Sequence, residues 1–205
     1  MVNLEKSLLK NLITTDERFA RSVNLKFDFY DDSNLPNYKF TRKSVELLEN
    51  IVDSTRGENK DRSWSIIGPY GSGKSIFSLL FMKLLCKSNS DWIDRSLENL
   101  NVLAPEFLQF IESETFDATS GYIPVIVQGT NDSLDISLCS SLLDATYLKD
   151  GNPSWASDQF RNSIEVAIDT LSTGIQGSQL TIDLYKKAIL LAKAQGYKGL
   201  VVAIY

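Results

Sequence analysis

The feature that most constrains the fold of this chain is a glycine-rich octapeptide at residues 68–75, which reads GPYGSGKS. It matches the pattern G-x-x-x-x-G-K-[ST], the phosphate-binding loop or Walker A motif, in which backbone N–H groups surround a phosphate. Glycines let the backbone wrap closely around that anion, and the following helix presents the positive end of its dipole to it. The motif therefore requires a strand before it and a helix after it.

The sequence on either side of the loop meets that requirement. A short apolar run at 64–67 predicts a strand, and an almost wholly apolar segment at 74–87 predicts a buried helix. We expect the Lys74 ammonium to lie between the β- and γ-phosphates of a nucleotide, and the Ser75 hydroxyl to bind Mg²⁺. The predicted cofactors are thus ATP and Mg²⁺, and Ser75 is the predicted metal ligand. The predicted nucleotide-binding residues are Gly68, Pro69, Tyr70, Gly71, Ser72, Gly73, Lys74, Ser75 and Ile76.

Beyond the loop, apolar runs at 122–128 and 199–205 predict two strands, the first of them buried from its composition. Helices are predicted from Asn131 or Asp132 to Leu148, over 155–171, and over 180–195 with a stop at Gly196. The order strand, helix, strand, helices, strand predicts a parallel sheet with helices on both faces. We therefore predict an α/β fold, a P-loop NTPase core with a three-layer parallel sheet, over residues 61–205.

Residues 1–60 are predicted to form a helical lead-in. Helical spacing of apolar residues predicts helices over 3–13, from about 16 to 23 and over 41–53, the last capped by Thr41. Short helical pieces broken at Pro105 are expected within 91–120. Between the lead-in helices, residues 24–38 suggest an extended piece and a turn. Their acidic residues are interpreted as a solvated turn, because the ligand pattern of a calcium loop is absent. Those residues are Asp28, Asp31 and Asp32.

Composition excludes several classes of chemistry. The 205-residue chain has no histidine, so it has no Ser-His-Asp triad, His-ligated zinc or imidazole base. Cys86 and Cys139 are expected to be free thiols in a reducing cytosol. A net charge of −5 argues against a globally basic nucleic-acid binder, although Lys39, Arg42 and Lys43 leave a nucleic-acid contact as the alternative to a solvated face. No long apolar run or cleavage site is present, so a cytoplasmic protein without a membrane partner is expected.

Hydrolysis in this class of protein needs acidic residues after a further apolar strand, to bind Mg²⁺ and to polarise the attacking water. The candidate strand is 200–204, which runs into Tyr205 without an acidic residue. We therefore expect nucleotide binding by a core that is incomplete at its C-terminus, with no catalytic residue assigned. Trp64, at the start of the first predicted strand, is expected to pack in the core.

Three segments together resemble the N-terminal part of large bacterial P-loop ATPases, of the AAA+/ASCE type, found in anti-phage defence operons. They read NYKFTRKSVELLENI, GPYGSGKSIFSLLF and AILLAKAQGYKGLVVAIY. The resemblance covers residues 15–205 and is specific at the loop glycines, Lys74 and Ser75. It implies a larger ATPase that couples hydrolysis to conformational work, in phage defence or DNA transactions, within a complex of several subunits. In the branch with an added strand, that strand separates 64–67 from 200–204, so these two are not expected to pair.

Alternative functions stay open at this point. An ABC or repair-type ATPase would explain Gln128 at a strand end and the LSTGIQ segment at 171–176, but Thr173 and Ile175 break the ABC signature. A GTPase would carry D-x-x-G and N-K-x-D, which are absent, and a small-molecule kinase would carry an arginine-rich lid. A nucleotide-binding regulatory module that does not hydrolyse its ligand remains the alternative from another functional class.

Overall fold

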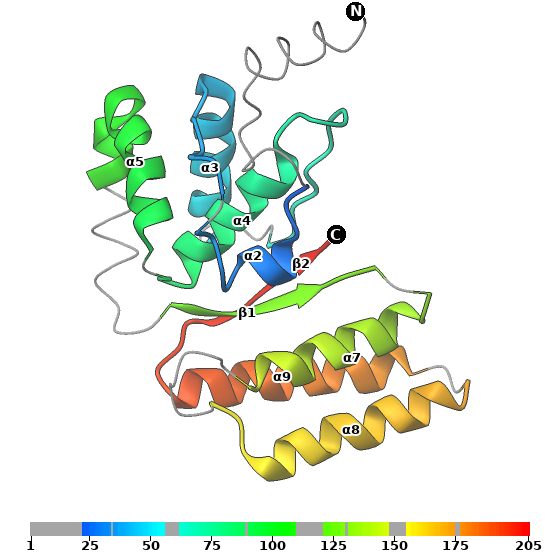
Figure 1. Cartoon of the computed structure of the whole chain (residues 1–205). Coiled ribbons are helices and arrows are strands. Elements are labelled where there is room, and N and C mark those ends of the chain that lie inside the picture. The colour runs from blue at the N-terminus through cyan, green and yellow to red at the C-terminus, as the bar shows by residue number, and fades with distance from the viewer. Residues whose placement is uncertain are drawn as a thin grey trace, which may run out of the picture.

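The structure is a computed structural model that describes residues 22–33, 35–55, 62–88, 90–109, 121–129, 131–147, 155–174 and 177–205. Its helices and strands follow one another along the chain and are shown in Figure 1. They are α2 (Leu25–Asp28), α3 (Arg42–Thr55), α4 (Lys74–Leu85), α5 (Asp91–Leu103), β1 (Tyr122–Val127), α7 (Leu134–Ala145), α8 (Asp158–Ser172), α9 (Ser178–Ala194) and β2 (Gly199–Ile204).

The two strands form a parallel pair at the centre of the molecule. Their register runs from Tyr122 opposite Gly199 to Val127 opposite Ile204. Both apolar runs at 122–128 and 199–205 were predicted as strands from their composition, and the structure confirms both. Parallel strands need a long crossover connection, which the helices α7, α8 and α9 provide.

Helices cover both faces of this strand pair (Figure 1). On one face, α2, α3, α4 and α5 pack into a hydrophobic cluster that includes Ile126 of β1. On the other, α7, α8 and α9 form a second cluster with Ile123, Val125 and Val127. Since successive strand residues point to opposite faces, burial of both faces explains why β1 is a continuous apolar run.

The described part of the lead-in packs into the same cluster as α4, through residues such as Leu48 and Ile51. Helix α3 starts after Thr41, as predicted, and the cap is reciprocal. The Ser44 N–H donates to Thr41 Oγ1 at 3.3 Å, and the Thr41 N–H donates to Ser44 Oγ at 2.8 Å. The helices predicted over 3–13 and from 16 to 23 lie outside the described residues, apart from the last residues of the second, which are not helical.

Helix ends agree with their sequence signals at most positions. Helix α5 ends two residues before Pro105, where a break was predicted. Helix α9 is followed by Gly196 at φ 89°, the left-handed stop that was predicted. Helix α7 differs slightly, because Ser133 is its N-cap and accepts from the Ile136 N–H at 3.3 Å, so the predicted caps at 131 and 132 are wrong.

The predicted strand at 64–67 is wrong, since residues 62–69 form neither helix nor strand. Trp64 is 44% exposed rather than packed in the core, and its indole N–H donates to Ser54 Oγ at 3.0 Å. Ile67 is 90% exposed. A strand requires a hydrogen-bonded neighbour, and among the described residues 62–69 has none, because the sheet contains only β1 and β2. Residues 64–67 and 200–204 therefore do not pair, but not for the reason expected, because 64–67 is not a strand.

The interpretation of residues 24–38 as an extended piece with a solvated acidic turn is wrong in part, because residues 25–28 are helical and two of the three aspartates are buried or paired. Asn24 caps α2, and its own N–H donates at 2.7 Å to Asp28, which is completely buried. Asp32 forms an ion pair at 2.7 Å with Lys83 of α4, whose side chain is only 3% exposed. Asp31 stays exposed and accepts from Ser33. The sequence indicates polar residues here but not the buried lysine, which is distant along the chain.

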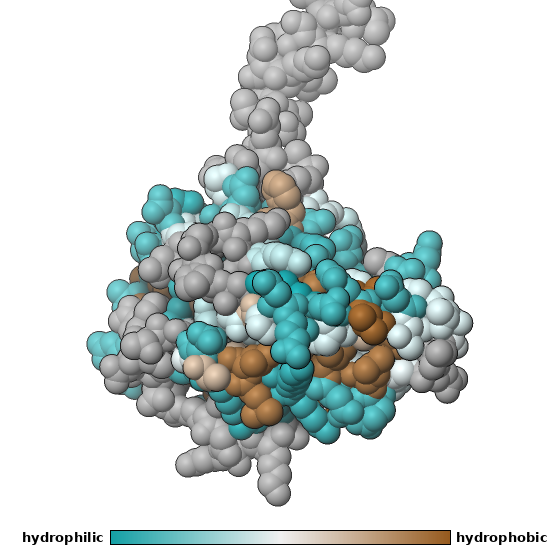
Figure 2. Space-filling model, turned by 90° about the horizontal axis from the view of Figure 1, so that it is seen from below, coloured by the Kyte–Doolittle hydropathy of each residue, from teal (hydrophilic) through white to brown (hydrophobic). Residues whose placement is uncertain are grey.

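The surface on the side of α7, α8 and α9 carries separate hydrophobic patches with hydrophilic residues between them (Figure 2). Exposed Leu134, Val166 and Leu190 come from these three helices. None of the helices that the structure describes is long and apolar enough to cross a membrane. The surface over α7, α8 and α9 thus mixes hydrophobic and hydrophilic residues rather than forming one charged surface.

Candidate functional site: the 68–75 loop and an adjoining cavity

The loop at 68–73 leads directly into α4, and two of its glycines adopt a backbone conformation that other residues avoid. Gly71 has φ 79° and Gly73 has φ 82°, both in the left-handed region. Gly73 is also the N-cap of α4, where no side chain caps the helix. Gly73, a fixed position of the motif, and Gly71 are thus the glycines that this turn requires.

Because no side chain caps α4, its first backbone donors lack protein partners. The first donor in this turn with an acceptor is the Phe77 N–H, which bonds to the Gly73 carbonyl at 3.0 Å. Within the described part of the chain, the N–H groups of Lys74, Ser75 and Ile76 have no acceptor. These donors lie at the positive end of the helix dipole, so the helix start attracts an anion.

The Lys74 side chain folds back over the loop that precedes it. Its ammonium donates to the Gly68 carbonyl at 2.9 Å and to the Pro69 carbonyl at 2.7 Å. A Cβ on Gly68 would lie 3.1 Å from Ser72 Oγ, so a larger residue at this position would crowd the turn. Lysine and loop together place a full positive charge beside the free N–H groups of α4.

The other loop residues are accessible. Ser75 is exposed, and its hydroxyl has no hydrogen bond to any described residue. Tyr70 is 97% exposed, so its ring packs against nothing in the loop. No group of three or more carboxylate or cysteine side chains that would hold a metal occurs in the part of the chain described.

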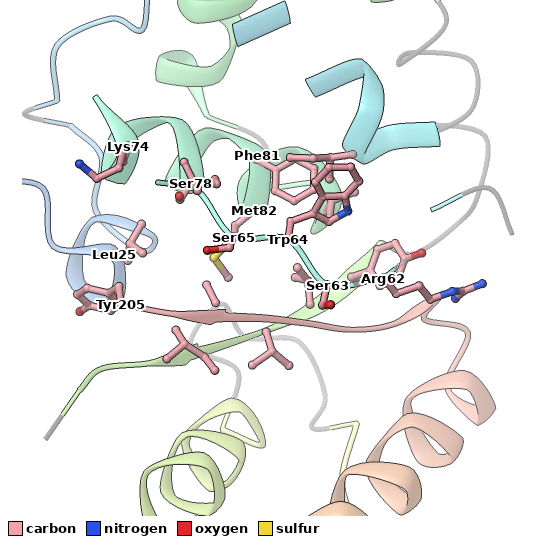
Figure 3. A pocket seen from close by; sticks show the side chains of 18 of the residues that line it. Leu25, Arg62, Ser63, Trp64, Ser65, Lys74, Ser78, Phe81, Met82 and Tyr205 are labelled. Atoms are coloured by element: carbon pink, nitrogen blue, oxygen red, sulfur yellow. The ribbon is translucent and has the colours of Figure 1, made fainter. Parts of the chain in front are cut away.

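A cavity of about 850 Å³ adjoins the loop (Figure 3). Lys74 and Ser75 border it, and it continues between residues 62–66, α4 and β2. Among the described residues that line it there is no aspartate or glutamate. The sequence did not predict this cavity, because it arises from the failure of 62–66 to pair with β2. Its apolar walls come mainly from Trp64, Phe81, Met82, Leu85, Val201 and Ala203.

The remaining candidate residues do not join this site. Gln128 is exposed at the end of β1, and no described contact links it to the loop. The LSTGIQ segment lies at the end of α8, with residues 175–176 outside the described part. Cys86 and Cys139 are free, as expected, and burial raises the pKa of both thiols, which disfavours the reactive thiolate.

Comparison with known proteins adds no assignment: no family model, curated protein or solved structure matches this chain. The 68–75 loop is therefore the candidate functional site, because a sequence motif and a local geometry coincide there.

Proposed function

We propose that the chain binds Mg-ATP, with the phosphates held by the 68–75 loop and the first turn of α4. The observation that carries this proposal is the coincidence of three features. Gly71 and Gly73 are left-handed, the first N–H groups of α4 are free, and the Lys74 ammonium lies against the loop carbonyls. Each feature favours binding of a multiply charged anion, and together they fit the phosphates of a nucleoside triphosphate.

In this proposal, Lys74 exchanges its two carbonyl acceptors for phosphate oxygens when nucleotide binds. Charge-assisted hydrogen bonds to phosphate are stronger than bonds to neutral carbonyls, so the exchange is favourable. The backbone N–H groups of residues 71–76 would hold the phosphates, and the Ser75 hydroxyl would be the protein ligand of Mg²⁺. Mg²⁺ supplies charge neutralisation between phosphates.

Two kinds of activity are consistent with such a site. One is an ATPase, in which hydrolysis in a larger assembly performs conformational work, in phage defence or DNA transactions. The other is a regulatory module that binds nucleotide without hydrolysing it. The described residues that line the cavity beside Lys74 and Ser75 include no carboxylate that could polarise water. We therefore expect the chain as given to bind Mg-ATP with negligible turnover.

The test compares Mg-ATP binding by wild type and Lys74→Ala in titration calorimetry. We expect the variant to lose binding, because it removes the single full charge of the loop. Lys39→Ala is the matched control, since Lys39 is exposed and outside the loop, and it should bind as wild type does. Equal affinity of wild type and Lys74→Ala would refute the proposal. Steady phosphate release that depends on Lys74 would leave binding intact but contradict the expected lack of turnover.

A further inference from the structure

We draw no further inference here: the strongest candidate, the apolar cavity between residues 62–66, α4 and β2, carries none because nothing in the structure shows what covers it.

Discussion

Substitution of Gly71 tests whether nucleotide binding needs the left-handed backbone of the loop. An added Cβ would meet nothing within 4 Å, so Gly71→Ala introduces no clash, yet φ 79° lies in the region that L-residues avoid. The left-handed conformation costs a non-glycine residue about 1–2 kcal/mol. The loop is exposed, so the variant relieves this strain by leaving the binding conformation rather than by unfolding.

This conformational cost should lower the affinity for Mg-ATP. If the binding conformation of the loop rises in free energy by about 1–2 kcal/mol, the apparent dissociation constant for Mg-ATP rises by roughly 5- to 30-fold, with little change in the urea midpoint. Calorimetric titration of the variant measures this directly. Gly129→Ala is the matched control, because its φ is ordinary and its Cβ would lie 3.5 Å from the Tyr205 carbonyl, a normal contact. An affinity and a stability both equal to wild type would show that nucleotide does not need the left-handed loop.

Three further predictions concern stability. Gly121→Ala places a Cβ 2.5 Å from a backbone oxygen at the end of α4, so it should destabilise the chain by about 1–3 kcal/mol in urea unfolding, whereas Gly129→Ala should have little effect. Lys83→Met should lower the free energy of unfolding by about 3 kcal/mol, because it leaves the Asp32 carboxylate beside an apolar side chain. Adding Asp32→Asn should restore much of this stability. A double variant no more stable than Lys83→Met alone would contradict this account. Burial raises the pKa of the Cys86 thiol above its value in the unfolded chain. Above about pH 8.5 the unfolded chain therefore loses a proton that the folded chain keeps, and the free energy of unfolding should fall by up to about 1.4 kcal/mol per pH unit. Cys86→Ala should reduce this pH dependence of the urea midpoint, measured from pH 7 to 10.

Much of the local structure followed from local sequence. The apolar runs at 122–128 and 199–205 are strands, and the cap at Thr41 and the stop at Gly196 are where the sequence placed them. These features depend on a residue and its immediate neighbours, or on burial of a whole run. They are therefore encoded in short windows. The Gly71 and Gly73 conformations belong to the same group.

The errors share a different physical origin, which is dependence on distant partners. Residues 64–67 have the composition of a strand, but no neighbouring strand pairs with them in the part of the chain described. Asp32 was interpreted as solvated because its partner, Lys83, is distant in sequence. The requirement for glycine at residue 121 comes from its approach to the end of α4, which no local pattern indicates.

The central claim is that phosphates bind the backbone of the 68–75 loop and the start of α4. The most direct measurement is an amide-resolved NMR titration of the ¹⁵N-labelled chain with Mg-ATP. The account predicts that the largest shifts fall on the amides of residues 71–76, which include the donors without acceptors at 74–76, and that Lys74→Ala abolishes them. Shifts centred elsewhere, or identical shifts in Lys74→Ala, would contradict it.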